Sequence, residues 1–262
     1  MQTQQYSDER NPVDDEKYDL EEPFKFFRVG EENTGTRDLA STELLSVLPG
    51  QHYSIKEKIL RLEFEGNAQN AQDAISINLQ VDASPGCGGI VWPAAQILSS
   101  YLIKKGSGFL HGNRVVELGS GTGLVGLIAA KLGASKVWIT DQQPLLGIMQ
   151  QNLSMNSLQY NCVVTELDWG TSIPTTIPPP DVILAADCVY FEPAFPLLVN
   201  TLDALATAGT LILFCYKKRR KADKRFFGML KKKFAWEEVM DDPNRNIYTR
   251  ESITLMKLSK LQ

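Results

Sequence analysis

The chain has 262 residues, of which 43% are apolar and 22% charged, and its formal net charge is −4. This composition is typical of a folded globular protein and excludes a collagen-like, fibrous or wholly disordered chain. The slightly negative charge gives no general attraction to nucleic acid or to an anionic membrane. The sequence contains no run of about 18 apolar residues, which excludes a membrane-spanning helix.

The amino-terminal sequence indicates an intracellular protein, and the cysteine and histidine content indicates a protein without a metal site. Residues 1–22 contain no apolar signal core, so we expect a cytoplasmic location. The chain has four cysteines and two histidines, and the cysteines form no CxxC pair. We therefore expect reduced thiols, and neither a disulfide framework nor a bound metal, at Cys87, Cys162, Cys188 and Cys215.

Three stretches of different composition divide the chain. Residues 1–24 hold eight acidic and two basic residues and few apolar ones, which predicts a disordered acidic tail. Residues 25–85 are predicted to be an N-terminal extension with a β-hairpin, because residues 60–64 and 75–81 alternate apolar and polar side chains. Residues 86–262 are predicted to form one folded domain.

From residue 86 onward, helical and extended patterns alternate. Pro93 suits the first turn of a helix, and apolar residues then recur at helical spacing up to residue 105. We predict strands over 114–119, 136–141, 162–169, 181–190, 209–216 and 252–258, and helices between them over 122–134, 144–156, 194–206 and 217–234. This alternation indicates parallel βαβ crossovers, so the predicted fold class is α/β, with a doubly wound, Rossmann-like, mostly parallel sheet.

The strongest local motif is VVELGSGTGLVG at residues 115–126, which follows a predicted strand and opens a predicted helix. Gly119, Gly121 and Gly123 allow a tight turn and a close approach of the backbone to a ligand. Asp141 ends the next strand, where a carboxylate can accept hydrogen bonds from both ribose hydroxyls. The motif therefore predicts a site for a nucleoside-containing cofactor.

Three interpretations of this glycine loop stay open from the residues alone. Gly121, Gly123 and Gly126 fit GxGxxG in a shifted register, which would suit a nicotinamide or flavin dinucleotide. Glu117 is unfavourable beside a pyrophosphate but suits the positively charged S-adenosylmethionine, as does the dominant G-x-G-x-G spacing. A tight turn that binds no ligand is the third interpretation.

Four features occur together along the chain: ELGSGTGLVG at 117–126, the strand-ending Asp141, DW at 168–169 and DCVY at 187–190. In combination they resemble a class I, seven-β-strand methyltransferase. The runs GCGGIVWPAA, LAADCVYFEPAFPLL and CYKKRRKADKRFF narrow the resemblance to protein-lysine methyltransferases of methyltransferase family 16, in particular a fungal member that methylates translation elongation factor 1-alpha. The resemblance implies a seven-stranded sheet, S-adenosyl-L-methionine as cofactor and elongation factor 1-alpha as protein partner.

The resemblance also implies roles for individual residues. Asp187 and Tyr190 of the D-x-x-Y motif would be the catalytic pair that shapes the channel for the target lysine. The cofactor would be held by Trp92, Glu117, Gly119, Ser120, Gly121, Asp141, Asp168, Trp169 and Ala186. Among these, Asp141 would bind the ribose, and Asp168 with Trp169 the adenine. Relatives carry an acidic residue or glutamine after the tyrosine of strand five, whereas Lys217 follows Tyr216 here, so their substrate contacts do not transfer.

The side chains of the D-x-x-Y motif suit transfer of a methyl group to an amine. A lysine has a pKa near 10.4, so presenting it neutral at pH 7 costs about 4.6 kcal/mol. Asp187 can orient the amine or accept its proton, and Tyr190 can supply a ring wall and a hydroxyl. Plainer roles stay open: Asp187 could cap the helix that starts near Pro193, and the aromatic residues could serve only packing.

A basic segment, defined here as residues 217–233, contains ten basic residues and one acidic residue. Three interpretations of it stay open: contact with RNA phosphates, docking of an acidic protein surface, and a solvated helix face. Taken together, the sequence predicts a monomeric, cytoplasmic, S-adenosylmethionine-dependent protein-lysine N-methyltransferase. The alternatives are an RNA or small-molecule methyltransferase and a non-catalytic S-adenosylmethionine-binding protein.

Overall fold

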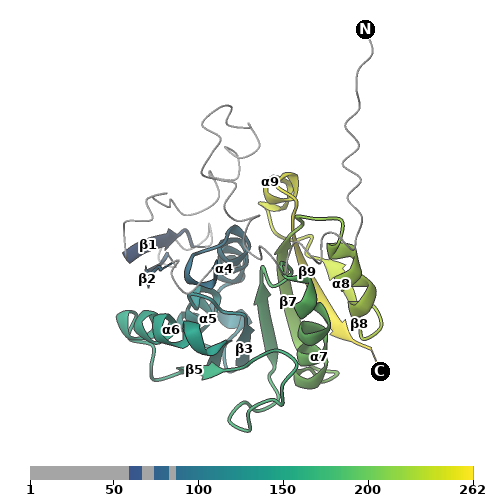
Figure 1. Ribbon diagram of the computed structural model, residues 1–262. Coiled ribbons are helices and arrows are strands. Elements are labelled where there is room, and N and C mark those ends of the chain that lie inside the picture. The colour runs from purple at the N-terminus through teal and green to yellow at the C-terminus, as the bar shows by residue number, and fades with distance from the viewer. Residues whose placement is uncertain (1–58, 67–73, 83–86, 262) are drawn as a thin grey trace.

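A seven-stranded sheet runs through the protein, and helices cover both of its faces (Figure 1). The computed structural model describes residues 59–66, 74–82 and 87–261. The predicted acidic tail, residues 1–24, and the predicted extension up to residue 58 lie outside these residues. No helix within the described ranges combines the length and the apolar character that crossing a bilayer requires.

The strand order across the sheet is β5-β4-β3-β6-β7-β9-β8. The strands are β3 (Arg114–Leu118), β4 (Lys136–Asp141), β5 (Cys162–Glu166), β6 (Val182–Ala186), β7 (Leu211–Lys217), β8 (Phe234–Glu238) and β9 (Ile253–Lys260). Strand β9 runs antiparallel to β7 and β8, and the other pairings are parallel, which confirms the predicted mostly parallel sheet.

The order of the strands reverses at the centre of the sheet. From β3 the chain builds outward through β4 and β5, and then returns to place β6 on the other side of β3. Open α/β sheets bind their ligands at such a switch point, outside the carboxyl ends of the two central strands. The loops that follow β3 and β6 therefore carry the expected site.

Two apolar clusters fill the space on the two sides of the sheet. Val115 belongs to one cluster and Val116 to the other, because successive side chains of a strand point to opposite faces. One face is covered by α4 (Pro93–Lys105), α5 (Leu124–Lys131) and α6 (Gln143–Met155), and the other by α7 (Phe195–Leu205) and α8 (Asp223–Leu230). The buried central strands and the two helical layers confirm the doubly wound arrangement.

The predicted β-hairpin is present and lies against two of these helices (Figure 1). Strand β1 (Ile59–Phe64) pairs antiparallel with β2 (Ile75–Gln80), and β2 contacts α5 and α6. The inward side chains of both strands belong to the same apolar cluster as α4, α5 and α6. The hairpin therefore shares the core of the sheet domain.

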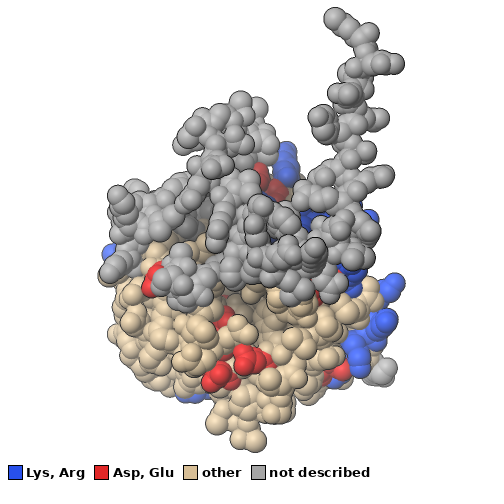
Figure 2. All heavy atoms as spheres, viewed as in Figure 1, with Lys and Arg blue, Asp and Glu red and all other residues tan. Residues whose placement is uncertain are grey.

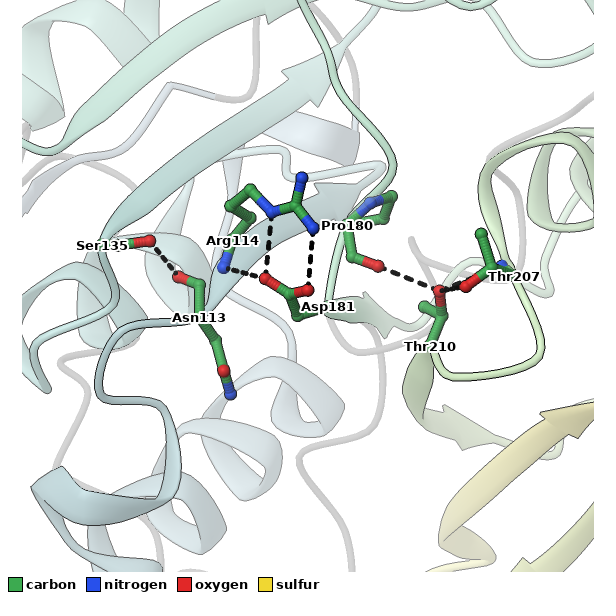
Figure 3. Close-up of polar contacts among 7 residues, drawn as sticks. All are labelled: Asn113, Arg114, Ser135, Pro180, Asp181, Thr207 and Thr210. Atoms are coloured by element: carbon green, nitrogen blue, oxygen red, sulfur yellow. Dashed lines mark hydrogen bonds and ion pairs between the residues drawn. The ribbon is translucent and has the colours of Figure 1, made fainter.

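The amino-terminal edge of the sheet is fastened by polar contacts away from the switch point (Figure 3). The Arg114 guanidinium donates to both carboxylate oxygens of Asp181, at 3.0 and 2.9 Å, and this pairing lowers the pKa of Asp181 to about 2. The Thr210 hydroxyl donates to the Pro180 carbonyl at 2.9 Å. These contacts join the starts of β3, β6 and β7.

The prediction of one long helix over 217–234 is wrong. Residue Lys217 is the last residue of β7, where it pairs with Ile253 of β9, and helix α8 spans only Asp223–Leu230. The residues between them form a loop whose arginines contact other parts of the protein. The sequence analysis also missed β8 and the short helix α9 (Arg245–Arg250), since most β8 side chains are exposed and show no apolar alternation.

Three short 3₁₀ helices complete the described structure: Cys87–Gly89, Ser107–Phe109 and Glu192–Ala194. The first joins the hairpin to α4, and the last precedes α7. Cys162, Cys188 and Cys215 are buried free thiols, whereas the side chain of Cys87 lies outside the described part.

Candidate active site

The glycine loop connects β3 to α5 at the switch point. Gly119, Gly121 and Gly123 have φ angles of +59°, +55° and +81°, in the left-handed region that favours glycine. Contacts also exclude a side chain here: a Cβ on Gly121 would lie 2.5 Å from the Gly88 carbonyl oxygen, and one on Gly119 would lie 2.8 Å from Trp169 Cζ2. The glycines are therefore required by the shape of the loop and by its two neighbours.

Glu117 lies beneath the loop and caps the helix that follows it. Its Oε2 accepts a hydrogen bond from the Gly126 N–H at 2.9 Å, in the first turn of α5, where backbone N–H groups lack helical partners. Burial raises the pKa of this carboxyl to about 8. A Cβ on Gly126 would lie 2.8 Å from the same oxygen, so this glycine makes room for the cap.

Ser120 ties the loop to the neighbouring strand. Its hydroxyl accepts from the Thr140 N–H at 2.9 Å and donates to the Glu117 carbonyl at 3.2 Å. The Ser120 N–H in turn donates to the Thr140 carbonyl at 3.0 Å. The position of the loop is thus set by β4 as well as by β3.

Asp141 stands at the end of β4, beside the loop. Its carboxylate accepts the Gly121 N–H and the Gln142 N–H, both at 2.8 Å. Burial, together with the negative charge of Asp168, raises the pKa of Asp141. Asp141 also adds to the raised pKa of Glu117. Glu117, Asp141 and Asp168 therefore form an acidic group around the glycine loop, and within the described part of the chain no lysine or arginine pairs with any of them.

Trp169 and the end of β6 form the neighbouring wall. The half-buried Trp169 ring lies against Gly119 and packs on the apolar cluster of the α7 face. The Asp168 carbonyl accepts from Thr171, so Asp168 also begins a turn. Ala186 is the last residue of β6, and the thiol of the next buried cysteine, Cys188, donates to the Leu118 carbonyl at 3.3 Å. These contacts join the carboxyl ends of β3 and β6.

Asp187 makes an ion pair that the sequence analysis did not foresee. Both of its carboxylate oxygens accept from the Arg219 guanidinium, at 2.7 and 2.6 Å, and one also accepts the Lys217 N–H at 3.2 Å. The side chains of Arg219 and Asp187 are 13% and 4% exposed. Asp187 also has a φ of +59°, so its neighbours hold an unusual backbone conformation. Its carboxylate faces Arg219, and no side-chain bond caps the 3₁₀ helix or the α7 helix that follow it.

Trp92 and Tyr190 belong to the same region. The Arg219 guanidinium lies 5.8 Å from the centre of the Trp92 ring, within the range of a cation–π contact. Trp92 is the residue before the first turn of α4, and Pro93 occupies that turn as predicted. Arg220, in the loop that follows β7, donates to the Tyr190 carbonyl at 2.6 Å and so fixes the backbone of the D-x-x-Y motif. The structure thus gathers Trp92, Asp187 and Arg219 in one cluster.

The basic segment, residues 217–233, is largely engaged with acidic residues of the protein itself. Its ion pairs include Lys217–Glu251, Arg219–Asp187, Arg220–Asp223, Arg225–Glu192 and Lys233–Asp203. Lys224, Lys231 and Lys232 are exposed, and Figure 2 shows basic side chains gathered at the edge of the molecule where α8 and β8 lie. The only acidic residue of the segment, Asp223, pairs with Arg220 of the same segment. Arg219, Arg220 and Arg225 therefore have structural roles that the sequence pattern did not indicate. Among the described residues, no group of three or more His, Cys, Asp or Glu side chains could hold a metal ion.

The fold is similar to that of solved Rossmann-like methyltransferase structures. Solved structures with similar folds include an S-adenosylmethionine-dependent methyltransferase from Streptococcus mutans, with a TM-score of 0.54 and 16% identity over 82% of this chain and 57% of that one. A tRNA m1G37 methyltransferase of M. jannaschii gives a TM-score of 0.51, with 16% identity over 79% of this chain and 58% of that one. At these identities the likeness concerns the fold alone.

Sequence comparison then gives the family. The family model described as lysine methyltransferase, methyltransferase family 16, matches residues 70–233. The protein-lysine N-methyltransferase EFM6 of Saccharomyces cerevisiae is 38% identical over 199 residues, which cover 66% of this chain and 81% of that protein. The protein N-lysine methyltransferase METTL21A of Danio rerio is 39% identical over 174 residues, which cover 64% and 78%. The chain belongs to this lysine methyltransferase family.

Proposed function

We propose that this protein transfers a methyl group from S-adenosyl-L-methionine to the side-chain amine of a lysine in translation elongation factor 1-alpha. The observation that carries the cofactor assignment is the acidic group around the glycine loop, Glu117, Asp141 and Asp168, without a lysine or arginine paired to it among the described residues. The carboxylates of Asp141 and Asp168 repel a pyrophosphate and attract a ligand with a positive sulfonium and ammonium. The residues present therefore fit this cofactor and disfavour a dinucleotide.

The proposed cofactor-binding roles combine the resemblance with the positions of the side chains. Asp141 retains lone pairs beyond its two backbone contacts, and these accept the ribose hydroxyls. Trp169 and Asp168 bind the adenine. The backbone of Gly119, Ser120 and Gly121, with Trp92, Ala186 and the buried carboxyl of Glu117, receives the methionine part. When bound, the cofactor supplies a methyl group already activated by the positive sulfur, so the protein needs no nucleophile of its own.

The protein's own contribution to the transfer is to present the lysine neutral and correctly oriented. Asp187 accepts a hydrogen bond from the amine and directs its lone pair, while Tyr190 lines the channel. Arg219 holds both oxygens of that carboxylate in place and adds a positive charge next to the amine. A positive charge nearby disfavours the ammonium form and thereby lowers the pKa of the amine.

The choice of substrate rests on family membership and on the resemblance to a fungal methyltransferase of elongation factor 1-alpha. The exposed side chains of Lys224, Lys231 and Lys232, in and just after α8, add a basic surface that suits docking of an acidic protein surface. We also propose that the enzyme acts as a monomer in the cytoplasm, where the buried thiols Cys162, Cys188 and Cys215 would stay reduced.

The test is transfer of a labelled methyl group into a lysate from cells that lack this protein, followed by mass identification of the modified residue. The proposal expects label in a lysine of elongation factor 1-alpha and transfer to that protein after purification. Label that survives protease but is lost with nuclease would instead identify an RNA substrate. Cofactor binding without any transfer would identify a non-catalytic binding protein.

A further inference from the structure

The outer edge of the β-hairpin is closed by side chains of the catalytic domain. In β2, the peptide groups that point away from β1 belong to alternate residues, Ser76, Asn78 and Gln80. The Lys131 ammonium donates to the Ser76 carbonyl at 2.9 Å. Asn152 of α6 and Asn156, the residue that caps the end of this helix, bind the other two residues. An edge strand covered in this way cannot pair with another chain.

The two asparagines hold β2 as a neighbouring strand would. The Asn156 amide accepts the Asn78 N–H at 3.1 Å and donates to the Asn78 carbonyl at 2.7 Å. The Asn152 amide accepts the Gln80 N–H at 2.5 Å and donates to the Gln80 carbonyl at 3.1 Å. Each side chain thus satisfies one N–H and one carbonyl of β2, with the same polarity and a spacing of two residues along the strand.

Only one of these two asparagines also contacts the glycine loop. The second N–H of the Asn152 amide donates to the Thr122 carbonyl at 2.9 Å, between Gly121 and Gly123. The second N–H of Asn156 donates to the backbone of its own helix instead. Asn152 is completely buried, and its amide oxygen and both of its amide N–H groups connect the hairpin with the loop.

The chain after β2 makes a second contact with the same loop. The Asp82 N–H donates to the Gly89 carbonyl at 2.8 Å, which directs the 3₁₀ helix Cys87–Gly89 towards the sheet. There the Gly88 carbonyl lies so close to Gly121 that a Cβ on Gly121 would be 2.5 Å from its oxygen. The hairpin and its continuation therefore reach two successive residues of the loop, Gly121 and Thr122.

We propose that the β-hairpin is a working part of the cofactor site and that Asn152 is the positioning residue that connects the two. The inference rests on the proposed function, in which the glycine loop receives S-adenosylmethionine. Glycines have more conformational freedom than other residues, so a loop with three of them loses much entropy when it is ordered around a ligand. By fixing the Thr122 peptide between two of these glycines, Asn152 provides part of that order before the cofactor binds.

The test compares two alanine variants that remove equivalent contacts to β2. Asn152→Ala and Asn156→Ala each delete a clamp on the hairpin, and both are expected to lower the melting temperature. Only Asn152→Ala also frees Thr122, so it should weaken the binding of S-adenosylhomocysteine about tenfold in calorimetry, as expected for the loss of one ordering hydrogen bond. The KM for S-adenosylmethionine should rise with kcat nearly unchanged, whereas Asn156→Ala should bind as the unaltered protein does.

Proline variants test the same connection without touching the asparagines. Gln80→Pro removes the N–H that holds the Asn152 amide, and Asn78→Pro removes the corresponding N–H held by Asn156. We expect weaker S-adenosylhomocysteine binding from Gln80→Pro alone, and this pair decides the question if Asn152→Ala does not fold. Equal affinities within both pairs would overturn the inference. If the unaltered protein does not bind S-adenosylhomocysteine at all, the cofactor assignment fails and the inference fails with it.

Discussion

Replacing Arg219 with alanine leaves the Asp187 carboxylate buried, with the Lys217 N–H as its one remaining partner among the described residues. Removing one member of a buried ion pair lowers the free energy of unfolding by about 3–5 kcal/mol. Because the Lys217 N–H still stabilises the Asp187 carboxylate, we expect a loss of about 3 kcal/mol. At about 2–4 °C per kcal/mol for a protein of this size, the melting temperature should fall by roughly 6–12 °C. Thermal unfolding followed by circular dichroism measures this change.

The same substitution should move the pH dependence of methyl transfer. If the target amine binds about 6 Å from the Arg219 charge, the two interact by roughly 3 kcal/mol at an effective dielectric constant of 20, and loss of that charge corresponds to about two pH units. The acid limb of the kcat profile, which reports groups in the enzyme–substrate complex, should therefore move upward in Arg219→Ala, so that activity lost at pH 7 returns at higher pH. Arg219→Lys keeps the charge and should keep the profile, although it cannot make the two-bond contact.

Arg114→Ala is the matched control for this experiment. Arg114 also donates to both oxygens of an aspartate, Asp181, but at the opposite edge of the sheet, and the two side chains are 44% and 42% exposed. Solvent screens an exposed pair, so this variant should lose little stability and keep the pH profile of the unaltered enzyme. A profile that stays fixed in Arg219→Ala, or that moves equally in both variants, would refute the role given to Arg219.

Three further substitutions test other parts of the site. In Asp187→Ala, calorimetry should show cofactor binding retained and assays should show transfer reduced at least about 100-fold; lost binding would place Asp187 in the cofactor site instead. Gly121→Arg should abolish S-adenosylhomocysteine binding, because even a Cβ there meets the Gly88 carbonyl, and an unchanged dissociation constant would contradict the loop assignment. Glu117 has a pKa of about 8, so the folded state retains a proton that the unfolded state has lost, and the free energy of unfolding should fall as pH rises from about 4.5 to 8. Urea titrations of Glu117→Gln, which keeps an oxygen for the Gly126 N–H, should show a flatter dependence; an equally steep one would argue against this carboxyl.

Much of the fold could be predicted because its signals are local. The strands β3, β4, β6 and β7 are apolar runs covered on both faces, and the glycine loop lies between a strand and a helix as its spacing indicates. The hairpin followed from the period-two alternation of its two strands. By contrast, β8 at the sheet edge has one buried residue followed by four exposed ones, so no apolar period could reveal it.

The missed parts of the site depend on contacts between distant segments. Arg219 meets Asp187 across 32 positions of sequence, and in the sequence it is one of ten basic residues that look alike. Asn152 lies 72 positions from Gln80, and a single asparagine in a helix carries no sign of such a partner. Glu117 was expected beside the methionine part of the cofactor; its position as a helix cap depends on how α5 leaves the loop. In each case the sequence gives the residue type but not the distant residue that it contacts.

Shortening the chain to begin at residue 87 would retain every residue proposed to touch the cofactor or the lysine. It would nevertheless remove Leu62, Ile77 and Leu79, all fully buried, and expose the apolar surface of α5 and α6 that these side chains cover. The amides of Asn152 and Asn156 would then lose their hydrogen-bond partners in β2. A truncated enzyme of this kind would tend to aggregate. Its loss of activity would therefore not argue against the roles of the catalytic residues that it still contains.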